Sequence, residues 1–447
     1  MTRRTAALLA VAALLGACGK GNEGGADSGR AADTTAAAAA ACTGDNGGIT
    51  LPGGFCATVF ADSIGRGRHA VVAPNGDVYV VLEYRKSAEG EKANKMSART
   101  DAVAALRDTN GDGKADTIAY FGKTGGTGIA LFDNHLYVDE QEKIVRWPMT
   151  AGQLVPTGEP EVIVSGLPNT GDHKAHNFTI GSDGALYVNN GSASNACQKE
   201  NRTLHSPGID PCKELETRAG IWKYDARTPN QRFSAKERFA SGIRNAEGLA
   251  FAPGTNQLWS TQHGRDQLQA NWPEKYDAKT SAEQPQEELM QVSQGDDLGW
   301  PYCYFDGNAK QLVLAPEYGG DGKQVGRCAE KKAPVAWFPG HWAPMDLLFY
   351  TGNNFPQKYR DGAFIAFHGS WNRAPEPQAG FRVVFQPLTG GKSSGQYETF
   401  ADGFAGAKLD PVMAAHRPVG LAVGPKGEMY ITDDTGGRVW RVTYSDR

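Results

Sequence analysis

The sequence predicts an all-β protein, a six-bladed β-propeller of four-stranded blades. Three observations favour this fold. Glycine is frequent, at 56 of 447 residues, short alternating strands outnumber helical periodicity, and a hairpin pattern recurs six times. Each copy has a polar start, an alternating strand, a glycine turn and a second strand that carries an aromatic residue. The copies lie around 68–80, 126–138, 171–188, 244–260, 341–366 and 417–432.

An apolar strand ending in a Phe-Ala-x-Gly-like step marks the last piece of each unit. These strands lie at 58–62, 119–122, 162–166, 238–242, 336–340 and 399–403. A further strand is visible in at least four units, at 143–147, 220–224, 381–385 and 438–442. The chain opens with a fourth-strand piece and ends after a third one. We therefore expect the N-terminal strand, 55–61, to complete the last blade and remove an exposed edge.

The N-terminus predicts export. Residues 1–17 combine two arginines, a short apolar run and small residues, which is typical of a signal peptide, whereas a membrane span needs about 20 apolar residues. Leu15-Gly16-Ala17-Cys18 looks like a bacterial lipobox, the alternative being an ordinary signal with a stray cysteine. Residues 18–47 read as a disordered tether, and 48–447 as the catalytic propeller. We expect a lipid-anchored protein that faces the periplasm or cell exterior, with no other membrane contact.

Six cysteines remain after Cys18, which suggests disulfides in an exported chain. We expect nearest neighbours to pair: Cys42 with Cys56, Cys197 with Cys212, and Cys303 with Cys328. The net charge of −4 argues against a nucleic-acid partner, which would require a strongly basic face.

In a propeller, the residues that open each innermost strand line one mouth of the central channel. The positions here are Arg68-His69, Thr127, His173 with His176, Arg244-Asn245, His341 and His416-Arg417. Five of these six positions are cationic or potentially cationic. Scattered arginines are usually a solvated surface, but their recurrence at one position of the repeat predicts a basic mouth that binds a small, multiply anionic molecule.

Two stretches near this mouth carry chemistry. His173 follows Asp172, and a carboxylate that orients an imidazole makes it a candidate general base; the alternative is a structural histidine at a strand start. Gly264 permits a tight turn whose carbonyls could hold a hard cation such as Ca²⁺.

A second metal motif lies in the first unit. Asp108, Asn110, Asp112 and Asp116 occupy positions 1, 3, 5 and 9 of a calcium loop with Gly113 at position 6. Ala119 replaces the usual glutamate at position 12. The motif therefore predicts a structural calcium loop, or an Asp/Gly turn without an ion, and not an EF-hand sensor.

Several separate motifs are similar to one known family. They are Asp172-His173 ten residues before Asp183-Gly184; Arg244-Asn245 with Gly248-Leu249; residues 262–266; Glu288-Leu289 before Gly299-Trp300-Pro301; residues 368–373; and Arg417-Pro418-Val419-Gly420. From about residue 48 onward the chain resembles the quinoprotein glucose/sorbosone dehydrogenases, particularly the sorbosone and pyranose dehydrogenase branch. These six-bladed propellers use pyrroloquinoline quinone (PQQ) and calcium to oxidise aldoses and related sugars.

The resemblance implies a role for each matching residue. It implies that His173 is the base, with Asp172 as its partner, and that Arg244 and Asn245 contact the quinone. It implies that Arg417 neutralises a PQQ carboxylate and that the carbonyls of Gly264 and Arg265 bind calcium. Further cofactor contacts are expected from Arg68 of the mouth and from His368 and Arg373, in a region where the glucose enzymes have a lysine.

The sequence also departs from the family at Ala246-Glu247, which places an acidic group near an anionic cofactor. The expected partners are a sugar and a separate electron acceptor, a cytochrome or a quinone, since no haem motif is present. Two alternatives stay open: a calcium-dependent lactonase or esterase on the same scaffold, and a non-catalytic lipoprotein propeller that binds a sugar or protein.

Overall fold

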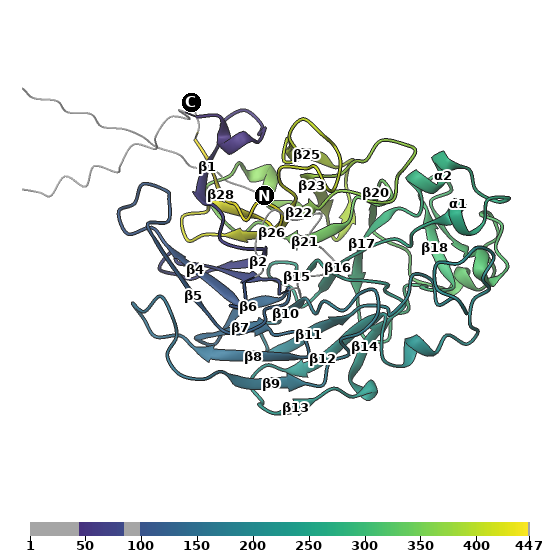
Figure 1. Ribbon diagram of the computed structural model, residues 1–447, viewed down its shortest axis with the longest axis horizontal. Helices are drawn as coiled ribbons and strands as arrows, with labels where there is room; N and C mark the ends of the chain where they lie inside the picture. Colours follow the sequence, from purple (N-terminus) through teal and green to yellow (C-terminus); the bar gives the residue numbers. More distant parts are fainter. Residues whose placement is uncertain (1–43, 85–98, 446–447) are drawn as a thin grey trace, which may run out of the picture. The chain divides into compact units, whose positions relative to one another are not determined.

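The structure, a computed structural model, describes residues 44–84 and 99–445. Six antiparallel sheets surround a common centre (Figure 1). The first blade contains β2 (Gly67–Val72), β3 (Val78–Leu82), β4 (Val103–Arg107) and β5 (Thr117–Phe121). The second contains β6 (Ile129–Phe132), β7 (His135–Asp139), β8 (Lys143–Pro148) and β9 (Glu161–Ser165), with β13 (Gln231–Arg232) added in parallel at its edge. The third contains β10 (Phe178–Ile180), β11 (Ala185–Asn190), β12 (Gly220–Asp225) and β14 (Arg238–Ser241).

The last three blades hold the remaining sheets. The fourth contains β15 (Leu249–Phe251), β16 (Leu258–Gln262), β17 (Glu287–Val292) and β20 (Ala336–Phe338). The fifth contains β21 (Pro344–Leu348), β22 (Gly362–Phe367), β23 (Arg382–Thr389), β24 (Lys392–Ser393) and β25 (Glu398–Ala401). The sixth contains β26 (Pro418–Val423), β27 (Met429–Asp433), β28 (Val439–Tyr444) and β1 (Phe55–Ala61).

The innermost strands close a ring. β2 contacts β6, β6 contacts β10, and the series continues through β15, β21 and β26 back to β2. β1 pairs with β28, from Phe55 opposite Tyr444 to Ala61 opposite Val439, so that the two ends of the described chain share one blade. The predictions of six blades and of closure by the N-terminal strand are confirmed.

Aromatic packing stabilises this closure. Phe55 of β1 lies in edge-to-face contact with Phe355, Tyr359 and Phe400 of the fifth blade, at ring-centroid distances of 4.8, 5.4 and 5.0 Å. Burying one phenylalanine side chain contributes about 1.5–3 kcal/mol. The irregular segment between β21 and β22 supplies Phe355 and Tyr359, so the interruption that the sequence shows in this blade is part of its core.

Two insertions interrupt the fourth blade. The first, between β16 and β17, contains α1 (Leu268–Asn271) and α2 (Ala278–Glu283), and the second, between β17 and β20, contains the hairpin of β18 (Cys303–Asp306) and β19 (Gln311–Leu314); both lie outside the ring in Figure 1. Short 3-10 helices lie at Asn46–Gly48, Lys213–Glu216, Ala235–Glu237, Pro316–Tyr318, Gly326–Glu330 and Gln357–Arg360.

Disulfides fix the long loops. Cys197 is bonded to Cys212 and Cys303 to Cys328, which confirms nearest-neighbour pairing for these two pairs. Cys56 is also in a disulfide, and its predicted partner Cys42 lies outside the described residues. No helix in the described part of the chain is long and apolar enough to span a bilayer. The predicted signal peptide and most of the tether also lie outside the described residues, while Asn46, within the predicted tether, accepts a hydrogen bond from the backbone N–H of Ala57.

Candidate functional site

The residues predicted to line the mouth lie near the start of each inner strand: Arg68 and His69 are inside β2, and the others precede their strands by one to five residues. His173 and His176 lie five and two residues before β10, so the prediction that they begin this strand is wrong. The buried His176 binds the carbonyl of Asn189 through Nδ1 (3.0 Å). The mouth is also paired in charge and not simply basic. Arg68 contacts Asp434 (3.1 Å) and Glu247 (3.6 Å), and His416 contacts Asp433 (2.8 Å).

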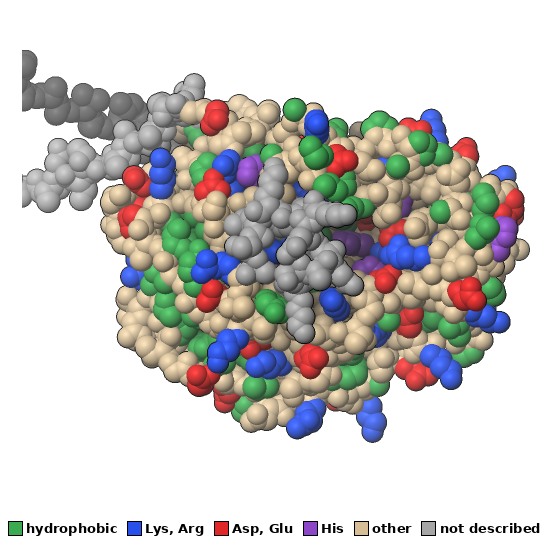
Figure 2. Space-filling model, viewed as in Figure 1, with side chains coloured by type: hydrophobic (Ala, Val, Ile, Leu, Met, Phe, Trp, Pro, Cys, Tyr) green, Lys and Arg blue, Asp and Glu red, His purple; other side chains and the backbone are tan. Residues whose placement is uncertain are grey.

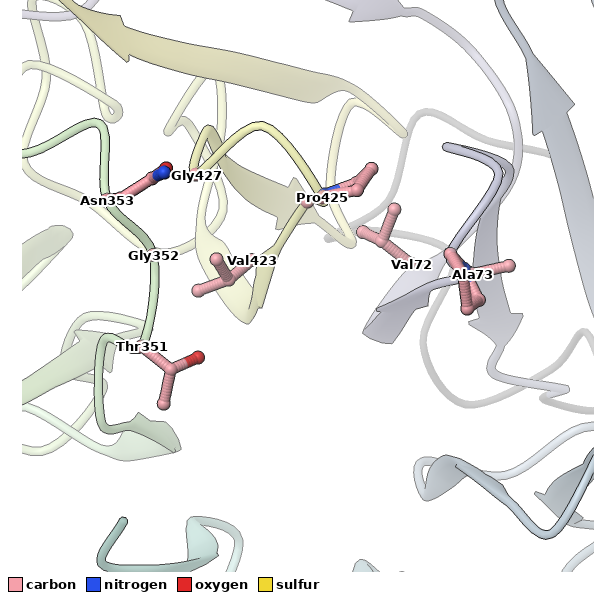
Figure 3. Close-up of a pocket in the computed structure, with 10 residues that line it drawn as sticks. Val72, Ala73, Thr351, Gly352, Asn353, Val423, Pro425 and Gly427 are labelled. Atoms are coloured by element: carbon pink, nitrogen blue, oxygen red, sulfur yellow. The ribbon is translucent and has the colours of Figure 1, made fainter.

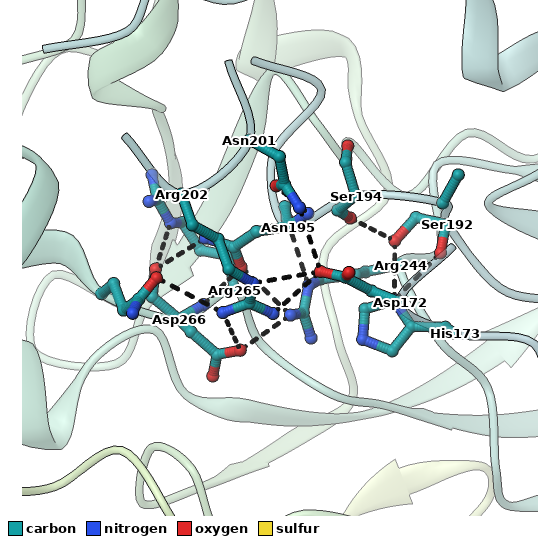
Figure 4. Close-up of polar contacts among 12 residues, drawn as sticks. Asp172, His173, Ser192, Ser194, Asn195, Asn201, Arg202, Arg244, Arg265 and Asp266 are labelled. Carbon is teal, nitrogen blue, oxygen red and sulfur yellow. Dashed lines mark hydrogen bonds and ion pairs between the residues drawn. The ribbon is translucent and has the colours of Figure 1, made fainter. Parts of the chain in front are cut away.

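Asp266 is the centre of the polar network at the mouth (Figure 4). Its carboxylate accepts hydrogen bonds from Arg244 (2.9 Å), Arg202 (3.1 Å) and Asn372 (2.9 Å), and lies 3.3 Å from His341. Burial alone would raise the pKa of Asp266, but Arg244 and His341 hold this pKa well below its usual range. The sequence motif contained Asp266, but nothing in it indicated that four different loops would converge on this carboxylate.

Arg244 is buried, and protein oxygens surround its guanidinium. Nη1 donates to the carbonyl of Gly264 (2.9 Å), Nε to the carbonyl of Asn195 (3.1 Å), and Nη2 to the side chain of Asn195 (3.0 Å) as well as to Asp266. The carbonyl of Gly264, a predicted calcium ligand, therefore already faces a cationic group. A loop that stabilises a guanidinium in this way has the donor chemistry to hold a metal cation.

His173 is partly buried beside Arg244. Its Nδ1 lies 2.9 Å from Oγ and 3.1 Å from the carbonyl oxygen of Ser192. A carbonyl oxygen only accepts, so Nδ1 carries the proton and Nε2 of the neutral ring keeps its lone pair. Burial, followed by the positive charge of Arg244, lowers the pKa of His173 well below its ordinary value. The ring is therefore a neutral proton acceptor at neutral pH.

The predicted pairing of Asp172 with His173 is not among the contacts of the described residues, since His173 binds Ser192 instead. The side chain of Asp172 is exposed and binds Arg202 (3.0 Å) and Asn201 (3.4 Å), as Figure 4 shows. Arg202 links Asp172 to Asp266. The two neighbouring side chains diverge because Arg202, on the loop closed by Cys197–Cys212, offers the carboxylate a charged partner while Ser192 binds the imidazole.

Two further histidines belong to this site. His341 was predicted as a position of the mouth and His263 lies in the same motif as Asp266, but no specific role was predicted for either. His263 binds the carbonyl of Pro344 through Nε2 (2.8 Å), and burial lowers its pKa to about 4. His341 lies between two acceptors, the carbonyl of Ser281 (2.8 Å) and Asp266. Burial would lower the pKa of His341, but Asp266 raises it above the ordinary value, so this ring is cationic.

The channel wall carries its own carboxylates. Glu247 contacts Arg68 and accepts a hydrogen bond from Asn245 (3.2 Å), so Arg68 balances the acidic group that departs from the family pattern. Asp139 and Asp346 are buried, and burial raises the pKa of each to about 8. These two groups are therefore neutral acids at pH 7.

His368 and Arg417 meet at the far side of the mouth. Arg417 donates to the carbonyls of His368 (3.0 Å) and Gly369 (2.7 Å), and its guanidinium lies 5.1 Å from the ring centroid of Trp371. His368 binds Asp434 (2.8 Å), the same carboxylate that Arg68 contacts. Figure 2 shows histidine side chains in a hollow near the centre of the molecule, beside acidic and basic side chains.

Arg373 does not join these residues, although it was predicted to bind the cofactor. Its guanidinium donates to the carbonyls of Pro377 (3.0 Å), Ala282 (2.6 Å) and Gly340 (3.1 Å), and to Glu283 (2.5 Å). Its donors hold neighbouring loops together. The side chain of Arg265 is likewise directed away, into a buried ion pair with Glu317 (2.5 Å), so only the backbone of Arg265 is available for a cation.

The predicted calcium loop joins β4 to β5. β2 and β4 run in the same direction, because β3 lies antiparallel between them. The loop after β4 therefore lies at the end of the blade where β2 ends, whereas the mouth lies where β2 starts. Asp108 accepts the N–H groups of Gly111 (2.7 Å) and Gly113 (2.8 Å), and Asp116 accepts that of Thr109 (2.9 Å). Among residues 44–84 and 99–445, no group of three or more His, Cys, Asp or Glu side chains is arranged to hold a metal ion.

A cavity of about 410 Å³ lies at the other ends of the inner strands (Figure 3). Segments that follow β2, β21 and β26 line it, among them Ala73, Thr351, Asn353 and Pro425. It has no charged side chain in its lining and is separate from the site at the mouth.

The chain matches known proteins along most of its length. The TrAA12-like family matches residues 49–445. An uncharacterized protein of Borreliella burgdorferi is 27% identical over 326 residues, 71% of this chain and 75% of its own length. A PQQ-dependent pyranose dehydrogenase of Coprinopsis cinerea is 28% identical over 173 residues, 32% of this chain but only 22% of that enzyme. An aldose sugar dehydrogenase of Escherichia coli is 24% identical over 233 residues, 52% of this chain and 46% of the relative.

Solved structures show the same fold. The iodide structure of the Trichoderma reesei carbohydrate-active enzyme of family AA12 has a TM-score of 0.72 at 18% identity and covers 89% of this chain and 98% of its own. The holo PQQ domain of the Coprinopsis cinerea pyranose dehydrogenase has a TM-score of 0.66 at 18% identity, with 88% and 97% covered. The family match over residues 49–445 shows that the chain belongs to the TrAA12-like family.

Proposed function

We propose that this protein is a quinoprotein sugar dehydrogenase that binds PQQ and Ca²⁺ at the mouth of the channel and oxidises an aldose or related sugar. The observation that carries the proposal is the neutral imidazole of His173 beside the buried Arg244, whose guanidinium binds the Gly264 carbonyl. The names of the relatives support it: a PQQ-dependent pyranose dehydrogenase, an aldose sugar dehydrogenase, and a PQQ-bound aldose sugar dehydrogenase of Streptomyces coelicolor. A calcium structure of the Trichoderma reesei enzyme supports the metal.

The residues at the mouth fit such a cofactor. PQQ carries three carboxylates, and guanidinium groups bind carboxylates through two parallel hydrogen bonds. Arg68, Arg244 and Arg417 supply this chemistry from the first, fourth and sixth blades, with Asn245 and His368 beside them. The carbonyls of Gly264 and Arg265 would hold the metal, since hard cations prefer oxygen ligands.

In this proposal a residue of the chain accepts the proton that the sugar hydroxyl releases. Nε2 of His173 takes the proton of the sugar hydroxyl, while Ser192 holds the ring through Nδ1 and fixes its tautomer. Burial, together with the charge of Arg244, which Asn195 and Asp266 fix in place, lowers the pKa of His173 and keeps the imidazole neutral between turnovers. PQQ with calcium, when bound, supplies the acceptor for the hydride. A separate cytochrome or quinone receives the electrons.

The lactonase alternative finds less support. Such sites hold their metal with converging inward Glu, Asp and Asn side chains. In the described part of this chain, Glu247 pairs with Arg68, and Asp346 accepts the backbone N–H groups of Leu347 and Leu421 (both 2.7 Å). These carboxylates are satisfied by the protein.

Export and anchoring are part of the proposal. The two disulfides suggest an oxidising compartment, and the lipobox at Cys18 would attach the chain by a lipid to a membrane that faces the periplasm or cell exterior.

A dye-reduction assay tests the function. Protein reconstituted with PQQ and Ca²⁺ should show a quinone absorption band and reduce an electron-accepting dye with at least one member of a panel of aldoses. A band without dye reduction across the panel would contradict sugar oxidation. The absence of any band would favour a non-catalytic sugar- or protein-binding propeller.

A further inference from the structure

A buried carboxylate joins two loops at the mouth. Glu287 is the first residue of β17, and its side chain is 2% exposed. Its Oε2 accepts the backbone N–H of Gly264 (2.9 Å), and its Oε1 accepts that of Ala343 (3.1 Å). Gly264 follows β16 in the fourth blade, and Ala343 directly precedes β21 in the fifth. One side chain thus ties together the loops of two adjacent blades.

The contact with Glu287 restrains Gly264, a residue with few conformational restraints of its own. Glycine has more backbone freedom than any other residue, so a loop that presents a glycine carbonyl requires an external restraint to fix its direction. Gly264 has such restraints on both sides. Its N–H is held by Glu287 (2.9 Å), and its carbonyl oxygen accepts a hydrogen bond from Arg244 (2.9 Å).

Glu287 thus anchors the peptide unit before Gly264, and the carbonyl of the next peptide unit faces a cationic group. The carbonyl of Gly264 binds the guanidinium of Arg244 at 2.9 Å. We infer that Glu287 is the positioning residue of the cation site at the mouth: by clamping the N–H groups of Gly264 and Ala343, it directs the carbonyls of 264–265 toward a bound divalent cation. This inference rests on the proposed function, which places Ca²⁺ at these carbonyls.

The chain offers a matched control in the next residue. Glu288 is also 2% exposed. Its Oε1 accepts the side-chain amide of Gln262 (3.0 Å), and its Oε2 has no hydrogen-bond partner within the described residues. A glutamine at 288 can still accept from Gln262, whereas a glutamine at 287 replaces one of two acceptors with an N–H₂ group that faces a backbone N–H.

The experiment measures calcium binding to the protein without PQQ, by titration calorimetry. All variants are made in an Asp108→Ala background, which removes the outer hairpin loop as a second candidate calcium site. We expect Glu288→Gln to retain the calcium affinity of this parent within about twofold, and Glu287→Gln to lose at least about tenfold, the effect of one strong hydrogen bond. Thermal unfolding of each variant reports folding separately, and Glu287→Asp, which keeps the charge but shortens the reach, serves if Glu287→Gln does not fold.

The outcomes are distinct. Weakened calcium binding in the folded Glu287 variants, with Glu288→Gln unchanged, supports the positioning role. Equal calcium affinity in the Glu287 and Glu288 variants overturns that role and leaves the proposed function intact. If the Asp108→Ala parent binds no calcium, both the carbonyl site and the role of Glu287 are wrong, and dye reduction by that parent then decides separately whether the sugar dehydrogenase proposal stands.

Discussion

At the scale of single residues, the charged groups at the mouth and the candidate base are different side chains. The cationic side chains Arg202, Arg244 and His341 gather on one carboxylate, Asp266, while His173 stays neutral a short distance away. A buried guanidinium beside an imidazole disfavours the imidazolium, and this has the same effect as burial itself. The site thus contains cationic groups that are paired with Asp266 and, beside them, a neutral imidazole.

The base is the first residue-scale prediction. His173→Ala should retain PQQ and Ca²⁺ affinity but lose about 10²–10⁴-fold in kcat, the usual contribution of a positioned general base. In the wild type, kcat should rise with pH through a midpoint below 6.5 and then stay constant, because the pKa of His173 is lowered and only the neutral ring accepts a proton. Steady-state kinetics across pH check both points. If His263→Ala removes the acidic limb and His173→Ala does not, His263 is the base.

The guanidinium groups give the second residue-scale prediction. Arg244→Ala and Arg417→Ala should each weaken PQQ binding about ten- to a hundredfold, since a charge-assisted hydrogen bond contributes about 1.5–3 kcal/mol. Fluorescence titration with PQQ measures the change, with Arg360→Gln, an exposed arginine of the fifth blade, as the control. Wild-type affinity in both alanine variants would place the quinone elsewhere.

At the scale of elements, loops between strands carry the chemistry and neighbouring elements fix their shapes. The loop that supplies Arg202 is closed by Cys197–Cys212, and the loop after β16 is held by Glu287 and by the ion pair of Arg265 with Glu317. The β4–β5 hairpin differs, because its carboxylates accept its own backbone N–H groups.

This hairpin yields the element-scale prediction. Asp108 binds the N–H of Gly113 and orders the turn, and three other oxygen side chains flank it in the predicted calcium loop. If the loop binds Ca²⁺, the metal should raise the thermal unfolding midpoint of the wild type more than that of Asp108→Ala. An equal shift in both proteins would show that the hairpin is an Asp/Gly turn without an ion.

At the scale of the whole molecule, neutral carboxylic acids are buried around the channel. Asp139 and Asp346 keep their protons in the fold to about pH 8, whereas their ordinary pKa is 3.8. Between these values the fold holds protons at these two groups that the unfolded chain has lost, so their contribution to the free energy of unfolding falls as the pH rises from about 4 to 8. Glu287 and Glu288, whose pKa values burial raises to about 7 and about 8, act in the same direction. Below pH 6.5 the histidines with lowered pKa values act in the opposite direction; they are His69, His173, His176, His263 and His368.

The corresponding prediction concerns stability. The thermal unfolding midpoint should be lower at pH 8 than at pH 7, where histidines are already neutral in the unfolded chain, and Asp139→Asn should reduce this difference because it removes one of the titrating groups. Calorimetric scans at the two pH values, with exposed Asp133→Asn as the control, measure it. A midpoint that rises over this range would mean that these acids are ionised in the fold.

Attachment is the second prediction at this scale. If Cys18 carries a lipid, Cys18→Ala should move the folded propeller out of the membrane fraction, since the anchor is the only membrane contact that we propose. Immunoblots of fractionated cells check this, and unchanged membrane association in the variant would rule out the lipid anchor.

The sequence by itself determined the fold, the closing pair β1–β28 and the ring of positions at the mouth. These follow from local alternation and from turns, which repeat in every blade and need no knowledge of distant loops. Neighbouring cysteines were likewise sufficient to predict two disulfides. The prediction of a calcium loop likewise rests on a short spacing of oxygen side chains.

Only the tertiary structure decided which charged side chains form ion pairs with one another. Arg68 and Asp434 are 366 residues apart in the chain, and ring closure alone brings their side chains to 3.1 Å. Asp172 forms an ion pair with Arg202 and does not bind its neighbour His173, because the loop closed by Cys197–Cys212 places Arg202 beside the carboxylate. The same convergence makes Asp266 the centre of the site and lowers the pKa of His173. Burial and pairing depend on loops from different blades, and a local pattern in the chain contains no information about how those loops meet.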